Sequence, residues 1–143
     1  MEKKQLFRIL AKADRDILIA FANKIEQEGT IRILKEPERT LTMIKLREPV
    51  RNSFFYLGEV MVTEAIVELD QVKGMAVTMG SDYEKTLAMA VIDCGFNSRL
   101  PVMDCVEREL LHLEQAQIKK EEEENAMYLK TMVSFQTMAG GEQ

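Results

Sequence analysis

The chain has 143 residues, a net charge of −5 at pH 7 and a pI near 5.1. This length fits a single domain over residues 1–143 with enough apolar content to bury a core. The acidic balance argues against a primary role in gripping a phosphate backbone, which needs clustered lysine and arginine. We therefore expect no nucleic-acid partner.

The first residues, MEKKQLFRILAKADRD, alternate charged and apolar side chains. They fit neither a signal peptide nor a membrane span, so we expect a cytoplasmic protein with no membrane partner. Cys94 and Cys105 are the only cysteines, and neither has a neighbour at metal-ligand spacing. We expect two buried, reduced thiols and no metal site; a disulfide or redox pair is the alternative.

The N-terminal third predicts two helices and then a change to strand. Helical spacing of apolar residues covers 3–13, and Asp14 is a typical N-cap for a second helix that ends before Gly29. From Thr30 the pattern alternates, and we expect short strands at 30–33 and 40–48, separated by a turn at the sequence Glu-Pro-Glu.

The stretch that follows predicts a long strand over Glu59–Leu69. Its first half is apolar on both faces, which indicates a central strand covered on both sides there. We expect a hairpin connection over Asp70–Gly74, with Gly74 at positive φ, and a return strand over Met75–Met79.

A Ser-x-x-Glu capping box at Ser81 predicts the start of the next helix, which breaks near residues 96–99. A last helix is expected from Val102 through the 120s, and an apolar segment from Met127 to Met138 then either packs back on the core or docks on a partner. The predicted fold is α+β: N-terminal helices, an antiparallel meander of three to four strands, two C-terminal helices and an apolar C-terminal segment.

Candidate anion contacts fall in two places. Arg47 and Arg51 flank Pro49 in the most cationic loop, and the helix that starts at Ser81 offers free amides. Asp82 and Glu84 in that first turn would repel an anion, and solvated loop charges are the simpler interpretation for the arginines.

The inventory of catalytic groups is thin. Motifs for a nucleophile elbow, a P-loop, a dinucleotide site or a zinc hydrolase do not occur. His112 is the only histidine, and Glu59 and Glu64 lie five apart in a strand and so point to opposite faces. We expect no catalytic residue in this chain. The ten methionines predict either core filling or a contact surface for another subunit.

Three segments in order carry a family resemblance: LGEVMVTEAIVELD, KGMAVTMGSDYEKTLAMAVIDC and the terminal VSFQTM. Together they resemble the G-subunit (PhnG) family of the carbon–phosphorus lyase system, over nearly the whole chain. Two segments depart from the family pattern: residues 48–53 replace a glycine-rich loop, and residues 73–76 lack an aromatic-glycine pair.

The resemblance implies a subunit of the complex that transfers a phosphonate onto the ribose of ATP. Adenine is released, and α-D-ribose 1-methylphosphonate 5-triphosphate is formed. It implies H, I and J subunits as partners and an iron–sulfur cluster only on the J subunit, with no cofactor on this chain. The chain would be an accessory rather than the main catalytic subunit.

The residues expected at the partner interface belong to the same matching segments. They are Gly58, Glu59, Thr63, Glu64, Phe135, Thr137 and Met138. Two alternatives remain open: a stand-alone small-anion-binding domain, and a homodimeric scaffold without an enzymatic role.

Overall fold

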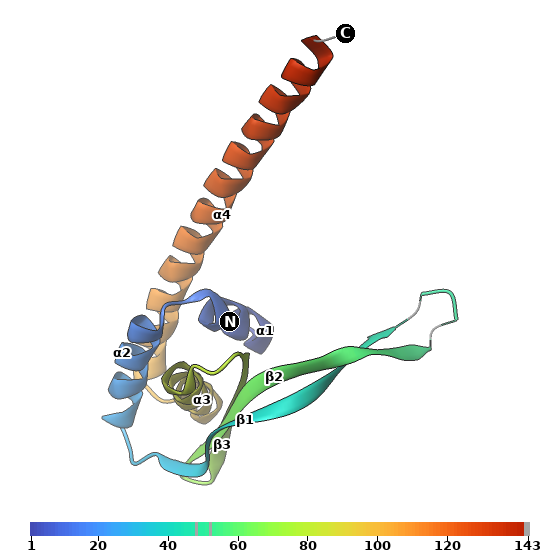
Figure 1. The fold of residues 1–143 in the computed structure, drawn as a ribbon. Coiled ribbons are helices and arrows are strands. Elements are labelled where there is room, and N and C mark those ends of the chain that lie inside the picture. The colour runs from blue at the N-terminus through green and yellow to red at the C-terminus, as the bar shows by residue number, and fades with distance from the viewer. Residues whose placement is uncertain (48, 52, 142–143) are drawn as a thin grey trace.

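The computed structural model describes residues 1–47, 49–51 and 53–141, apart from the side chains of residues 44, 46, 56, 57 and 133–141. In chain order the elements are α1 (Lys3–Lys12), α2 (Arg15–Glu26), β1 (Arg32–Arg47), β2 (Phe54–Leu69), β3 (Val72–Met79), α3 (Tyr83–Ser98) and α4 (Val102–Gly141). Helices pack on the sheet to form a compact body. The far end of the β1–β2 hairpin and the C-terminal part of α4 project from it (Figure 1). The predicted α+β class is confirmed.

The three strands form an antiparallel meander in the order β1-β2-β3, which makes β2 the central strand as predicted. β2 begins at Phe54 rather than at Glu59, and its first half runs out beyond the helices (Figure 1). The expectation that both faces of this half are covered is wrong, since Met61 is 41% exposed. An apolar sequence pattern indicates what can be buried, whereas neighbouring elements decide what is buried.

The Glu-Pro-Glu segment does not form the predicted turn. Residues 36–38 lie inside β1, whose pairing with β2 shifts register between Ile33 and Lys35 and again between Lys35 and Glu38. Pro37 cannot donate to a ladder, but an edge strand tolerates it at a bulge. The two short strands expected here are therefore one 16-residue strand.

The connection from β2 to β3 is shorter than predicted. Asp70 and Gln71 both have positive φ, 50° and 70°, and form a two-residue turn whose twist matches the flanking strands. Gly74 lies within β3 opposite Val67 and does not have the predicted positive φ. Its lack of a side chain serves packing instead: a Cβ there would lie 2.4 Å from the Ala90 carbonyl oxygen of α3.

Helix α3 is the centre of the packed body. It contacts β3 and β2 on one side and α2 on the other, so residues 88–95 are all buried. Its N-cap is Asp82, whose carboxylate accepts a hydrogen bond of 3.1 Å from the Lys85 amide, and not Ser81 as predicted. An aspartate directly before the first turn makes the stronger cap because its charge also complements the helix dipole.

The remaining core joins α1, α2 and the first half of α4 around α3. Its largest buried side chains include Leu6, Ile9, Leu10, Leu18, Ile25, Met89, Ile92, Val106 and Leu110. Cys94 is buried here as expected, whereas Cys105 is exposed, and both are free thiols. The prediction of two buried thiols is wrong for Cys105, because the face of α4 that it occupies has no neighbouring element.

Helix α4 is one continuous helix of 40 residues, about 60 Å long. The expected break between a charged helix and a separate apolar segment does not occur. Lysine and glutamate have high helix propensity, so the helix continues through the charged run into the apolar segment. Among the hydrogen bonds and ion pairs of the described residues, the one farthest along α4 that joins it to the body is the ion pair of Glu121 with Lys12. Beyond it the helix extends away from the other elements (Figure 1).

Candidate functional site

The first candidate surface is the hairpin arm, defined as residues 41–47 of β1 with residues 54–61 of β2. The pairing of β3 with β2 stops at Val62 and Met79, so this part of β2 pairs with β1 alone. The arm points away from the helices (Figure 1). Its exposed apolar side chains are Leu41 (59%), Met43 (54%), Phe54 (63%), Phe55 (47%) and Met61 (41%). Exposed apolar groups that are contiguous mark interaction surfaces.

Two of the predicted interface residues lie on this arm. Gly58 is half-buried, next to a register shift between the two strands, and a Cβ there would meet nothing within 4 Å. Glu59 is exposed and lies opposite Met43 of β1. Among the residues that the structure describes, Glu59 has no ion-pair partner.

The next two predicted residues lie at the base of the arm. Thr63 is fully buried, and its hydroxyl donates a 2.6 Å hydrogen bond to the Gly80 carbonyl oxygen. It therefore holds the end of β3 against β2 and does not present its side chain to a partner, which corrects its expected place on an interface. Glu64 is half-buried and pairs with Lys35 of β1 at 3.2 Å.

The second candidate surface is the helical arm, defined as residues 122–141 of α4. Its described side chains are all exposed, including Met127 (70%), Tyr128 (64%) and Leu129 (60%). From 126 onward Lys130 is the only charged residue until Gly141. The predicted interface residues Phe135, Thr137 and Met138 belong to this arm, although their side chains lie outside those described. A helix that is apolar around most of its circumference is normally buried.

The sheet adds a third uncovered surface. Helix α3 packs on the face that carries Gly74 and Ala76. Met75, Val77 and Met79 alternate onto the other face and are 49%, 49% and 73% exposed. With Met43, Met61, Met127 and Met132, this places six of the ten methionines on exposed surfaces. Of the two uses predicted for methionine, the exposed positions favour contact with a partner, since methionine adapts to irregular surfaces.

The candidate anion contacts do not come together. Arg47 is at the tip of the hairpin arm, its guanidinium 5.0 Å from the Phe54 ring, and Arg51 follows in the tip turn. Ser81 lies at the base, just after Gly80, whose amide bonds to the Met61 carbonyl oxygen. Seven residues of β2 separate base from tip, which is about 23 Å of extended chain.

The Ser81 end has one cation that the sequence did not single out. Arg15 of α2 lies in the same shallow hollow, but it faces Glu84 at 3.9 Å and Asp16 at 3.9 Å. The Asp82 carboxylate already accepts the hydrogen bond of the Lys85 amide in the first turn. The negative charge of these carboxylates disfavours the binding of a phosphate or phosphonate at the start of α3.

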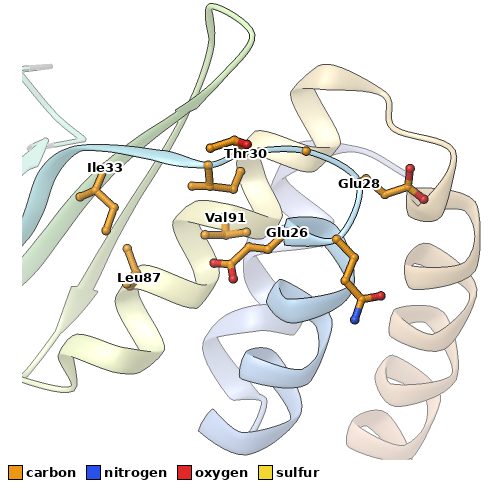
Figure 2. Close-up of a pocket in the computed structure, with 9 residues that line it drawn as sticks. Glu26, Glu28, Thr30, Ile33, Leu87 and Val91 are labelled. Atoms are coloured by element: carbon orange, nitrogen blue, oxygen red, sulfur yellow. The ribbon is translucent and has the colours of Figure 1, made fainter.

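A hollow of about 430 Å³ lies where α2 leads into β1, lined by residues 26–31 with Ile33, Leu87 and Val91. Figure 2 shows Ile33 and Leu87 pointing toward one another on its apolar side, while the Glu28 carboxylate points away. The ionisable groups in its lining are Glu26 and Glu28, and no lysine or arginine joins them. An anionic ligand is disfavoured there because neither side chain would neutralise it.

No catalytic set appears in the described residues. His112 is exposed on α4, and no three described His, Cys, Asp or Glu side chains gather at metal-ligand spacing. Burial raises the pKa of the Cys94 thiol, which donates a 3.3 Å hydrogen bond to the Val72 carbonyl oxygen. A protonated, buried thiol is a poor nucleophile. None of the described helices combines the length and apolar character that a membrane crossing needs.

The fold and these surfaces define a small α+β protein whose uncovered arms, rather than a pocket of reactive groups, are its distinctive features. The model of the family described as phosphonate metabolism protein PhnG matches residues 1–141. The chain belongs to this family, as its resemblance implied. The comparison with curated proteins found no match.

Family membership places the chain in phosphonate metabolism. Of the interface residues predicted from the family segments, Glu59 is exposed and the helical arm contains three. The exposed apolar side chains of the hairpin arm that sequence reasoning did not select are Leu41, Met43, Phe54, Phe55 and Met61. Their alternation in an apolar strand was visible, but only the position of β3 shows that this segment has a single neighbour.

Proposed function

We propose that this chain is an accessory subunit of the carbon–phosphorus lyase core complex, with H, I and J subunits as its partners. The complex transfers a phosphonate onto the ribose of ATP, with release of adenine, and forms α-D-ribose 1-methylphosphonate 5-triphosphate. The chain acts in the cytoplasm and shapes or stabilises a partner's active site. It holds no cofactor; ATP is a substrate of the complex, and the iron–sulfur cluster belongs to the J subunit.

The observation that carries this proposal is the pair of arms without neighbours. An isolated two-stranded ribbon is only marginally stable in water, and so is a helix segment that packs against nothing. The hairpin arm and the helical arm both carry exposed apolar side chains. Their presence is explained if a larger protein covers them. The described residues bring no acid, base and nucleophile together, which fits a subunit that supports chemistry on a partner.

Rough magnitudes indicate that several surfaces engage together. The five exposed side chains of the hairpin arm are about half-buried already, and covering the rest contributes about 1 kcal/mol each. The loss of translational and rotational freedom on association costs about 4–15 kcal/mol, and only the stabilisation beyond this cost contributes to affinity. The hairpin arm alone would therefore give weak binding, whereas both arms together with Met75, Val77 and Met79 would suffice for a stable complex.

The test is co-expression of the chain with the H, I and J subunits, followed by affinity capture on a tag carried by the I subunit. We expect the chain to co-purify in fixed stoichiometry. The captured complex should release adenine from ATP in the presence of methylphosphonate, and a complex expressed without this chain should lose that activity.

Two results would overturn the proposal. The chain could remain unbound as a monomer while the other subunits assemble and release adenine without it. Alternatively, calorimetry could show that the isolated chain binds ATP or methylphosphonate, which would support the stand-alone anion-binding alternative. Light scattering of the isolated chain distinguishes the homodimeric alternative from both.

A further inference from the structure

The backbone of β2 has a free edge between Phe54 and Met61. Strand β3 occupies that side of β2 up to the pair of Val62 and Met79. Gly80 then takes a φ of 93°, which turns the chain away toward α3. Beyond this point no described strand pairs with that side of β2, although β2 continues for eight residues to the tip of the arm.

One hydrogen bond shows toward which side the backbone N–H and C=O groups of this part of β2 point. The Gly80 amide donates to the Met61 carbonyl oxygen at 3.3 Å, so the backbone of Met61 faces the β3 side. In an antiparallel ladder, alternate residues bond to opposite sides. The N–H and C=O groups of Glu59 therefore also face the free edge, where they lack a strand partner.

The opposite edge of the sheet, formed by β1, has features that protect it from pairing with another strand. The outer edge of β1 belongs to a strand with seven charged residues, Arg32, Lys35, Glu36, Glu38, Arg39, Lys45 and Arg47, and it carries the Pro37 bulge. Charges, proline and bulges are the features by which proteins protect an edge from pairing with another chain. Between Phe54 and Met61, Glu59 is the only charged residue and there is no proline. The register shift of this segment lies between Gly58 and Tyr56, so the ladder stays regular from Glu59 to Met61, and this part of the edge is left available.

We propose that a β-strand of a partner subunit pairs with this edge, in line with β3, and extends the sheet along the hairpin arm. This inference rests on the proposed function, because it assigns the mode of docking within the same complex. Main-chain hydrogen bonds would supply affinity, and alternate side chains of the incoming strand would meet Met61 and the other apolar groups of the arm.

The chemistry of the arm indicates what the incoming strand contains. Its apolar residues would be interrupted by a lysine or arginine across from Glu59, whose carboxylate has no ion-pair partner among the described residues. A second copy of this chain fits less well. It would present its own Phe54–Met61 segment, which has neither lysine nor arginine to pair with Glu59.

The test compares Glu59→Pro with Glu59→Ala in the co-expressed complex. Both variants remove the carboxylate, but only proline removes the N–H that faces the free edge; the bonds between β1 and β2 use other residues. We expect Glu59→Ala to weaken capture by the tagged partner about threefold or less and Glu59→Pro to weaken it at least tenfold. Circular dichroism and thermal unfolding of both variants show whether the fold is kept.

Hydrogen–deuterium exchange on the wild-type protein gives a second measurement that does not depend on the variants folding. We expect the amide of Glu59, which faces the free edge, to exchange fast in the isolated chain and slowly in the complex, whereas the neighbouring amides that bond to β1 are protected in both. Equal capture of both variants, or fast exchange at Glu59 in the wild-type complex, would overturn strand pairing while the proposed function stands.

Two further outcomes are also decisive. If the wild-type chain is not captured by any partner subunit, the proposed function itself fails. If light scattering shows a dimer of the isolated chain that Glu59→Pro dissociates and Glu59→Ala does not, the occupant of the edge is a second copy, and the partner-strand proposal is wrong.

Discussion

The buried carboxylate of Asp93 on α3 lies 3.2 Å from the ammonium nitrogen of Lys3 on α1. Its second oxygen accepts hydrogen bonds from the Met75 amide of β3 at 2.9 Å and from the Asn97 side chain at 3.4 Å. One side chain, only 6% exposed, thus connects the first helix, the last strand and the central helix. These elements are far apart in sequence, so the contact helps to define how the body closes.

Replacement of Asp93 by alanine should destabilise the protein by about 3 kcal/mol. It leaves the Met75 amide without its acceptor and removes the buried partner of Lys3. Lys3→Ala should cost less, about 2 kcal/mol, because it leaves one oxygen of the buried carboxylate unpaired while the Met75 amide keeps its acceptor. Urea unfolding of both single variants and the double variant measures the coupling. A cost for Asp93→Ala no larger than that for Lys3→Ala would contradict the connecting role.

Substitution of Gly74 by alanine tests the close approach of β3 to α3. The added Cβ would lie 2.4 Å from both the Ala90 oxygen and the Cys94 nitrogen, which are backbone atoms and cannot rotate away. We expect a loss of about 3 kcal/mol in the free energy of unfolding. Gly58→Ala is the matched control, because its Cβ would meet no atom within 4 Å and should change stability by less than about 1 kcal/mol. Equal effects at both positions would refute this packing.

The two cysteines should differ in reactivity. Cys105 is exposed and should react with a thiol reagent in the native protein at pH 8, whereas Cys94 should react only on unfolding. Mass spectrometry after short labelling identifies the modified residue, and labelling in urea provides the control. Modification of Cys94 as fast as Cys105 in the native state would contradict its burial.

Cys94 also gives a pH dependence. Burial raises the pKa of its thiol above the ordinary value of 9.0, so the folded state favours the protonated form. Its contribution to stability is fully present below the unfolded pKa and is lost as pH rises through the folded pKa. Urea midpoints of the wild type should thus fall above about pH 9 more steeply than those of Cys94→Ala. Parallel curves for the two proteins would disprove this contribution.

Removal of residues 126–143 should separate stability from assembly. The described side chains from 122 to 132 are all exposed, so the shortened chain should unfold within about 2 °C of the intact protein. Capture by partner subunits should fall at least tenfold if the helical arm docks. A large drop in unfolding temperature would instead mean that this arm contacts the body, and unchanged capture would remove it from the interface.

Local patterns in the sequence were sufficient for several elements. The 3.6-residue period located α1 and α2. The apolar residues on both faces of the first half of Glu59–Leu69 indicated a central strand, and a helix beginning just after Ser81 was expected and found. Errors arose where local signals have two structural meanings. Proline at 37 marks either a turn or a bulge, and the charged run at 119–124 suits either a helix end or its continuation. The choice depends on neighbours that sequence spacing does not specify.

The sequence by itself determined the α+β class, the thin inventory of catalytic groups and, through three ordered segments, the family. Those properties depend on residue types and their period, which the chain carries locally. Only the tertiary structure decided that Thr63 is buried while Glu59 is free, that the candidate anion contacts lie apart, and that β3 ends where the free edge of β2 begins. Burial and strand pairing are relations between distant segments, and they exist only once α3 closes on one part of the sheet and leaves the hairpin arm uncovered.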